Sequence, residues 1–211
     1  EEITSSDASH LCPRGYKWNG CAAIGSMVYG IPHQANCILV YDLSTQSLSS
    51  IDTSGIKLST DRAWHGGVAI GDILYGVPGS ADCLVILDTI TGQLCSEKID
   101  HVANGEHRWN SVVAFNDIIY GVPFSADCLL AYDTTTKSSV GIDTSMLATG
   151  PFKWSGAVEY DGKIYAAPCN ANCFLVFDII SGTVSGIDIS SVSTLPLKWD
   201  AAVLVDAKVY A

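Results

Sequence analysis

Charge is scarce in this chain of 211 residues: charged side chains make up 16% of it, whereas hydrophobic residues make up 48%. Its apolar runs stay well short of the roughly 18 residues that a membrane span requires, so we expect no membrane span. No window carries an apolar stripe at the helical period, which argues against a helical domain. A composition this poor in charge suits sheets that are packed on both faces.

Motifs that carry chemistry are missing as well. The sequence contains no G-x-S-x-G, HExxH, paired CxxC or P-loop motif, so we predict no catalytic residue, no metal ligand and no cofactor. The net charge of −11 argues against nucleic acid or an anionic membrane as a partner. These absences favour a binding protein over an enzyme.

What the chain does contain is a repeat, marked most clearly by tryptophan. Its five tryptophans are separated by 46, 45, 45 and 45 residues, at Trp18, Trp64, Trp109, Trp154 and Trp199. A Tyr-Gly-x-Pro or Tyr-Ala-Ala-Pro motif, an Ala-(Asn/Asp)-Cys motif and an aspartate after the next apolar run keep the same spacing in four repeats. A fixed period of about 40–50 residues is typical of propellers and solenoids.

Each repeat holds four short β-like segments separated by Gly, Pro, Asn, Asp and Ser, which is the size of one propeller blade. The predicted fold is therefore all-β: a β-propeller of four-stranded antiparallel blades, in one domain over residues 1–211. We expect five blades, at about 17–60, 61–107, 108–152 and 153–197, with a partial fifth made of 198–211 and 1–16. In that fifth blade Glu2-Ile3 would be an outer strand. A truncated chain from a larger ring is the alternative.

The repeat pattern K-W-x-G-A-V…G-x-I-Y-G-x-P-x-x-A-x-x-V-L-x-x-D-x-x-T-G resembles the YVTN/kelch-like superfamily of β-propeller repeats. It is seen here from Phe152 as FKWSGAVEYDGKIYAAPCNANCFLVFDIISG, and the resemblance covers nearly the whole chain. The chain lacks the paired glycines of true kelch units and the Trp-Asp of WD repeats. Because propellers of this general type are mostly binding platforms, with some lyases and lactonases among other propellers, the resemblance implies a fold rather than one activity.

The eight cysteines give mixed signals. Their number suits an oxidising compartment, so a secreted, extracellular or organellar location is favoured over the cytoplasm, although the compartment stays open. Four recur at equivalent positions, and sheets packed about 10 Å apart would keep them from pairing. We expect these four to be small buried hydrophobic residues: Cys37, Cys83, Cys128 and Cys173. Cys169 and Cys173 flank one loop and could form a disulfide.

Basic residues recur on the propeller face where the loops that enter the first strand and leave the second strand meet. One precedes each tryptophan, and these five are nearly half of the eleven lysines and arginines: Lys17, Arg62 (shifted by one position), Arg108, Lys153 and Lys198. They could form a cationic ring for an anionic ligand or an acidic partner. Alternatively, each stem packs over an aromatic ring with its charge in water.

Two further sets of side chains are predicted on this face. The residue after each tryptophan is polar and varied, which suits an axial channel that binds a ligand or water: Asn19, His65, Asn110, Ser155 and Asp200. The loops after the second strands carry variable residues on a constant frame, where specificity often lies: His33, Gln34, Ser80, Phe124 and Asn170.

The remaining polar positions are weaker candidates. A recurring Asn or Asp in the loop after the second strand is expected to cap the turn, at Asn36, Asp82, Asp127 and Asn172. The five histidines fall at different positions of the repeat. Near the channel only His65 and Asp200 are candidates for a metal or catalytic site.

We therefore predict a non-catalytic interaction propeller that binds a protein partner or belongs to a larger assembly. A lectin-like propeller with one glycan site per blade is the first alternative, although the unequal loop residues speak against it. An enzyme with a single site in the axial channel is the second.

Overall fold

The computed structural model describes residues 7–12, 15–56 and 62–211, and within these ranges it consists of β-strands and one short 3-10 helix, η1 (Ser9–Leu11). Four antiparallel sheets of four strands follow one another along the chain, each with its strands in sequence order. The first two blades contain β1 (Trp18–Ile24), β2 (Met27–Pro32), β3 (Cys37–Asp42), β4 (Ser47–Asp52), β5 (Trp64–Ile70), β6 (Ile73–Pro78), β7 (Cys83–Asp88) and β8 (Leu94–Lys98). The next two contain β9 (Trp109–Phe115), β10 (Ile118–Pro123), β11 (Cys128–Asp133), β12 (Ser139–Asp143), β13 (Trp154–Tyr160), β14 (Lys163–Pro168), β15 (Cys173–Asp178) and β16 (Thr183–Asp188).

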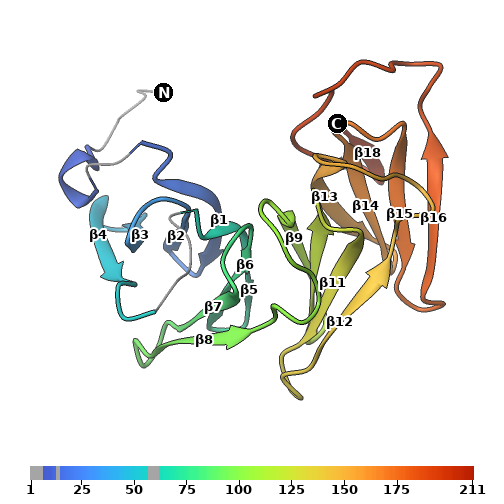
Figure 1. The fold of residues 1–211 in the computed structure, drawn as a ribbon. Coiled ribbons are helices and arrows are strands. Elements are labelled where there is room, and N and C mark those ends of the chain that lie inside the picture. The colour runs from blue at the N-terminus through green and yellow to red at the C-terminus, as the bar shows by residue number, and fades with distance from the viewer. Residues whose placement is uncertain (1–6, 13–14, 57–61) are drawn as a thin grey trace.

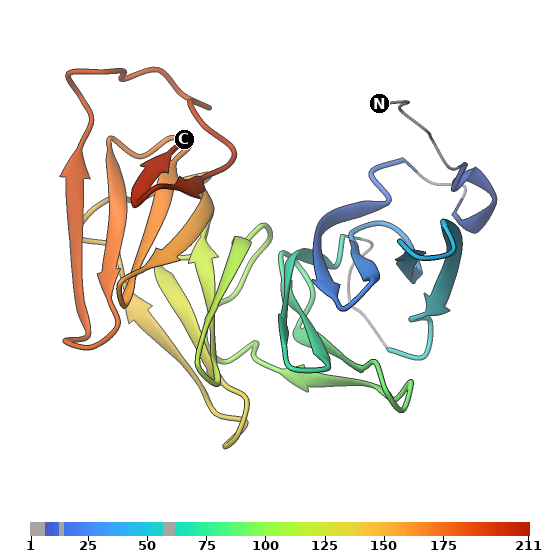
Figure 2. The same ribbon diagram turned by 180° about the vertical axis from the view of Figure 1, so that it is seen from behind.

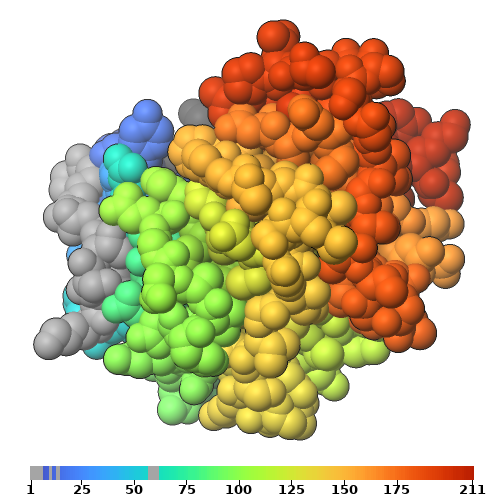
Figure 3. Space-filling model, turned by 45° about the vertical axis from the view of Figure 1, so that its right-hand side comes forward, coloured from blue at the N-terminus to red at the C-terminus, as the bar shows by residue number. Residues whose placement is uncertain are grey.

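The blades stand side by side in the order of the chain (Figures 1 and 2). Their first strands are in contact, β1 with β5, β5 with β9, and β9 with β13, so these strands form the centre of the molecule. In the space-filling view the green, yellow and orange blades adjoin one another (Figure 3). The predicted all-β propeller of four-stranded antiparallel blades is confirmed.

The first strands approach so closely that side chains are excluded at two points. A Cβ atom on Gly20 would lie 2.6 Å from Cα of Gly66 in the next blade. One on Gly156 would lie 2.4 Å from Cα of Ala201. Main-chain atoms cannot move aside as a flexible side chain can, so glycine is required at both positions. The sequence-based expectation of small residues next to the axis is confirmed.

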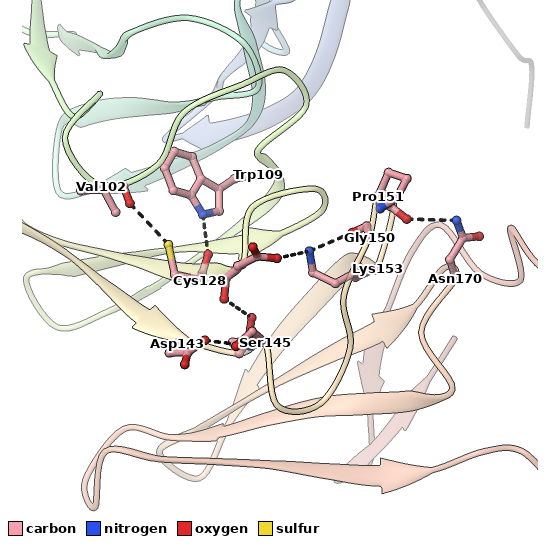
Figure 4. Close-up of polar contacts among 11 residues, drawn as sticks. Val102, Trp109, Cys128, Asp143, Ser145, Gly150, Pro151, Lys153 and Asn170 are labelled. Atoms are coloured by element: carbon pink, nitrogen blue, oxygen red, sulfur yellow. Dashed lines mark hydrogen bonds and ion pairs between the residues drawn. The ribbon is translucent and has the colours of Figure 1, made fainter.

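Each blade is braced by its tryptophan in the same way. The indole N–H donates to the carbonyl oxygen of the cysteine that begins the third strand, at 2.9 Å from Trp18 and 2.7 Å from Trp64. The corresponding distances for Trp109 and Trp154 are 2.9 and 2.8 Å. Figure 4 shows the hydrogen bond from Trp109 to Cys128. A buried indole N–H needs a partner, and this constant partner explains why Trp and Cys keep one spacing in four repeats.

The aspartates that end the third strands form turns as the sequence suggests. The carboxylate of Asp42 accepts from the main-chain N–H groups of Ser44 and Thr45, and Asp133 does the same for Thr135 and Thr136. The pKa of Asp42 is lowered most by a hydrogen bond from the hydroxyl of Thr45 and next by the N–H of Ser44, and the pKa of Asp133 is lowered by the N–H groups of Thr136 and Thr135. Such turns are what an Asp followed by Ser, Thr or Gly favours.

All eight cysteines are free thiols. The disulfide considered between Cys169 and Cys173 is therefore not formed in this structure. The two thiols have different surroundings: Cys173 lies beside Gly186 of β16, whereas burial, followed by the charge of Asp200, raises the pKa of Cys169. Of the four periodic cysteines, Cys37 and Cys83 are buried and Cys128 and Cys173 are half-buried, so the expectation of small buried residues holds fully for two of them.

The chain ends in a two-stranded sheet, β17 (Val203–Val205) and β18 (Lys208–Tyr210), which contacts β13. These are the first two strands of the predicted fifth blade. The outer strand predicted at Glu2-Ile3 lies outside the described residues. In the described part of the chain no helix is long and apolar enough to cross a membrane.

Candidate binding face at the axial mouth

A β-bulge follows the tryptophan in all four complete blades. Between Trp18 and Cys21, for example, the first strand advances three residues while the second strand advances two, from Pro32 to Gly30. Equivalent shifts occur in the other three blades. A bulge adds one residue without a ladder partner and re-aims its side chain. It therefore explains how the polar residue after each tryptophan can face the axis.

A cavity of about 410 Å³ lies on the axis among the first strands. Four of the five polar residues predicted to line a channel line it: Asn19, Asn110, Ser155 and Asp200. Nearby glycine and alanine residues, together with Cys21, Ser111 and Val112, complete the wall. We call this cavity the axial pocket. Its lining residues lie at the beginning of the first strands, next to the loops that precede these strands and follow the second strands, and we call this end of the axis the axial mouth.

Three of the pocket side chains form one hydrogen-bonded chain across the last three blades. Nδ2 of Asn110 lies 2.7 Å from Oγ of Ser155. Oγ of Ser155 in turn lies 2.6 Å from Oδ1 of Asp200 and 3.1 Å from its carbonyl oxygen. Ser155 is buried, so these contacts replace water as its hydrogen-bond partners.

His65, the fifth predicted pocket residue, lies among other histidines. It is 3% exposed, and its ring centroid lies 4.5 Å from that of His33 and 5.4 Å from that of His107. Both of its ring nitrogens lack a hydrogen-bond partner within the described residues. Burial, followed by the charges of His33 and His107, lowers the pKa of His65 to about 3, although the nearby side chain of Asn110, which makes no hydrogen bond of normal geometry to the ring, acts in the opposite direction. The ring is therefore a neutral packing group at physiological pH, and its neighbours do not include Asp200.

The basic residues before the tryptophans do not form a cationic ring. Arg108 is 2% exposed, donates to the carbonyl oxygens of Ala81 and Ala103, and lies 5.1 Å from the centroid of Trp109. Lys153 is 1% exposed and donates to the carbonyl of Gly150 at 3.0 Å (Figure 4). Burial lowers the pKa of both groups. Both charged groups therefore donate hydrogen bonds to main-chain carbonyls and stabilise the loop that connects two blades.

The outer members of the set are turned toward loops as well. Nζ of Lys17 lies 3.5 Å from the carbonyl of Ala8 and 5.7 Å from the Trp18 ring. Nζ of Lys198 lies 2.9 Å from the carbonyl of Leu195. Arg62 is the exposed exception, with Nη1 3.4 Å from Nε2 of His107.

The recurring loop aspartate is also used differently from the turn cap that we expected. The Asp127 carboxylate lies 3.6 Å from Nζ of Lys153, across the boundary between two blades. At the equivalent position the charge of Asp82 raises the pKa of Arg108, against the larger effect of burial. A buried cation needs a nearby counter-charge, which explains the choice of Asp in these two loops.

Four bulky residues at the mouth have a left-handed backbone. Each stands two positions before a tryptophan: Tyr16 (φ 46°), His107 (φ 53°), Phe152 (φ 60°) and Leu197 (φ 53°). We call them the rim residues. This conformation costs about 1–2 kcal/mol for a residue with a Cβ atom. Their side chains range from half-buried, for His107 and Phe152, to 83% exposed, for Tyr16.

Main-chain hydrogen bonds explain the backbone of the rim residues. The carbonyl of Tyr16 accepts from the N–H of Gln34, that of His107 from Ser125, and that of Phe152 from Asn170. These bonds tie the connection between blades to the loop after the second strand. These hydrogen bonds, here called the clasp, require the carbonyl group to point toward the loop but require no side chain. Glycine would adopt the same backbone conformation at a lower energetic cost.

The variable loop residues are divided between support and exposure. Oγ of Ser80 accepts from the N–H of His107, and Oδ1 of Asn170 accepts from the N–H of Leu197, so both hold a rim residue of the next blade. Phe124 instead stacks on Phe152, with ring centroids 4.7 Å apart. His33 and Gln34 are half-buried. The mouth therefore presents rim side chains and Phe124 around the polar axial pocket.

Sequence reasoning missed the rim residues. The sequence did contain a sign of them. The position before the basic residue is apolar or aromatic in four of the five repeats, although a loop ordinarily carries a polar residue there. The sequence also showed no relation between the histidines, whereas the rings of His33, His65 and His107 lie in contact at the mouth. The reason is geometric, because positions from three different phases of successive repeats converge there.

Comparison with known proteins supports the fold and no more. No family model matches the sequence, and no curated protein matches it. Among solved structures, the extracellular domain of the putative one component system BT4673 from B. thetaiotaomicron has a TM-score of 0.66 at 14% identity, over 97% of this chain and 26% of that chain. A chain of the Nidogen/Laminin complex gives 0.61 at 13% identity, over 82% and 64%. The computationally designed Ika8 protein gives 0.54 at 11% identity, over 95% and 68%. This chain thus spans about a quarter of the B. thetaiotaomicron protein.

Proposed function

We propose that this chain is a non-catalytic binding propeller whose axial mouth receives a protein partner. The observation that carries the proposal is the set of rim residues. Tyrosine, phenylalanine, histidine and leucine are kept where the backbone favours glycine and where the clasp needs no side chain. Side chains retained against such a cost point to a use for the side chains themselves.

The composition of the mouth fits a protein partner. Rigid aromatic side chains dominate the energetic centres of protein interfaces. Phe152 is held by Phe124 on one side and by His107, at a centroid distance of 6.1 Å, on the other. A partner would therefore meet a side chain that has already lost its freedom, which lowers the entropic cost of binding. One structural neighbour was solved in a Nidogen/Laminin complex, which at 13% identity shows only that such a fold can occur in one.

The two alternatives find less support. A lectin with one site per blade needs equivalent pockets, whereas two pockets at blade boundaries have unlike walls, one around Lys153 and Asn170 and one around His101 and Asp143. An enzyme needs an activated nucleophile or a metal. Ser155 contacts Asp200 and Asn110 rather than a histidine, and the described part of the chain contains no group of three or more metal-ligating side chains in a suitable arrangement.

Site-specific photo-crosslinking tests the proposal. A photoreactive phenylalanine would replace Tyr16 at the mouth or Thr135, an exposed residue of the turn between β11 and β12 at the opposite end. In extract from cells that express the protein, we expect one discrete adduct from position 16 that excess unlabelled chain suppresses. Adducts of equal yield from both positions, or none from position 16, would contradict the proposal.

A further inference from the structure

The hydrogen-bonded chain in the axial pocket has a direction that its chemistry determines. The Asp200 carboxylate only accepts, so the single hydroxyl proton of Ser155 is donated to Oδ1, at 2.6 Å. The Asn110 atom 2.7 Å from Oγ of Ser155 must then be a donor, which makes it Nδ2. The amide orientation of Asn110 follows from this argument, although amide oxygen and nitrogen are otherwise hard to distinguish.

Because the hydrogen bonds run in this direction, acceptor atoms remain open in the pocket. The proton of Ser155 and one N–H of the Asn110 amide are used within the wall. The second N–H of the Asn110 amide is not used in this chain, and the acceptors that remain are Oδ1 of Asn110 and the second carboxylate oxygen of Asp200. A ligand that satisfies them must bring N–H or O–H groups, and a carboxylate binds a charged donor more strongly than a neutral one.

The charges around the mouth also favour a cation. The chain carries a net charge of −11, which raises the local concentration of cations near it. Four of the five basic residues expected to oppose this are turned away. Arg108 and Lys153 are buried, and Nζ of Lys17 and of Lys198 face loop carbonyls. These four residues therefore do not form the cationic ring that was considered as one alternative for an anionic ligand or an acidic partner.

We propose that the axial pocket binds a primary ammonium group, with Asp200 as its counter-ion and Asn110 and Ser155 as positioning residues. In the binding function proposed above, a lysine side chain of the partner would supply this group, and that assignment rests on the proposed function. A free alkylamine is the other source of the same chemistry. A pocket of about 410 Å³ is large enough for either.

The test is a titration of the 211-residue chain with n-butylammonium, followed by amide NMR shifts. We expect saturable shifts at Gly66, Ser155 and Gly156, and none with n-butanol or butyrate. Asp200→Asn keeps the shape and removes the charge, and should weaken binding about tenfold, the effect expected of a hydrogen bond to a charged group. Asp72→Asn, in the turn between β5 and β6 at the opposite end, removes the same charge and should leave the affinity unchanged.

Several results would overturn the inference: no saturable shifts in the wild type, equal weakening by Asp200→Asn and Asp72→Asn, or equal binding of butyrate. Thermal midpoints of both variants check that they are folded. Acetylating the lysines of the cross-linked partner separates the sources. Loss of the adduct assigns the site to a protein lysine, and its persistence assigns the site to a free amine. If position 16 gives no adduct but n-butylammonium binds through Asp200, the proposed function fails while the pocket assignment stands.

Discussion

The inner blades and the terminal blades carry the same sequence markers but reach different degrees of burial. Trp64, Trp109 and Trp154 are all 0% exposed, whereas Trp18 and Trp199 are half-buried. Trp18 still donates to its cysteine carbonyl, because that bond lies within one blade. The comparison separates two contributions: the hydrogen bond is a property of the blade, and the burial comes from the preceding blade, whose side chains pack against Trp64, Trp109 and Trp154 and which Trp18 lacks within the described residues.

The comparison predicts its largest effect for tryptophan. Trp154→Ala should lower the free energy of unfolding by about 3–5 kcal/mol, because a fully buried ring is removed and the Cys173 carbonyl loses its donor. Trp199→Ala should cost less than about 1 kcal/mol, since this ring stands in the incomplete blade. Urea denaturation followed by circular dichroism measures both. Equal losses would mean that the blades do not depend on their neighbours for burial.

A second effect is expected for the basic residues. Arg108→Met should destabilise the fold by about 2–4 kcal/mol, because the carbonyls of Ala81 and Ala103 lose a charged donor in a buried site. Lys17→Met, at the equivalent but more exposed position of the first blade, should cost less than about 1 kcal/mol. The same denaturation series checks them. A loss from Lys17→Met as large as that from Arg108→Met would remove the distinction between inner and terminal loops.

A smaller and pH-dependent effect is expected for His65. Its pKa is lowered in the folded state, so the unfolded chain takes up a proton first as the pH falls below about 6.5. The stability that the neutral ring contributes is therefore complete above pH 6.5 and is lost toward pH 3, at up to about 1.4 kcal/mol per pH unit. His65→Asn, which installs the residue of the first and third blades, should flatten the profile between pH 6.5 and 4.5. A profile unchanged by the substitution would assign the acid sensitivity to other groups.

The sequence predicts what depends on the repeat itself. The period set by Trp, the Tyr-Gly-x-Pro motif and the glycine and alanine residues near the axis predicts the blades and the crowded centre, because each of these is a local requirement of one blade. The contacts that a basic side chain makes cannot be predicted in this way. They depend on where the upstream loop places a carbonyl, five residues before Arg108 and three before Lys153. Neither loop can be derived from the pattern.

The rim residues and the histidine cluster could not be predicted from the sequence for another reason. A left-handed backbone is readable where glycine stands, and here Tyr16, His107, Phe152 and Leu197 stand instead. The cluster contains His33, which follows a proline, His65, which follows a tryptophan, and His107, which precedes an arginine. Only the lateral packing of the blades brings these phases together.

The smallest expected effect on stability belongs to Phe152. In Phe152→Gly, the relief of backbone strain should offset most of the lost ring contacts, so the free energy of unfolding should change by less than about 1 kcal/mol. Phe124→Gly is the matched control, because it removes the other ring of the pair at a position without positive φ. It should be less stable than Phe152→Gly by about 1–2 kcal/mol.

The most direct test of the account measures this stability together with binding. For Phe152→Gly, the crosslinking yield from position 16 should fall at least about fivefold, as expected for an interface residue worth more than about 1 kcal/mol, while the urea midpoint stays near that of the wild type. An unchanged yield, or a loss of stability as large as that of Phe124→Gly, would contradict the claim that the rim side chains are held against backbone strain in order to bind.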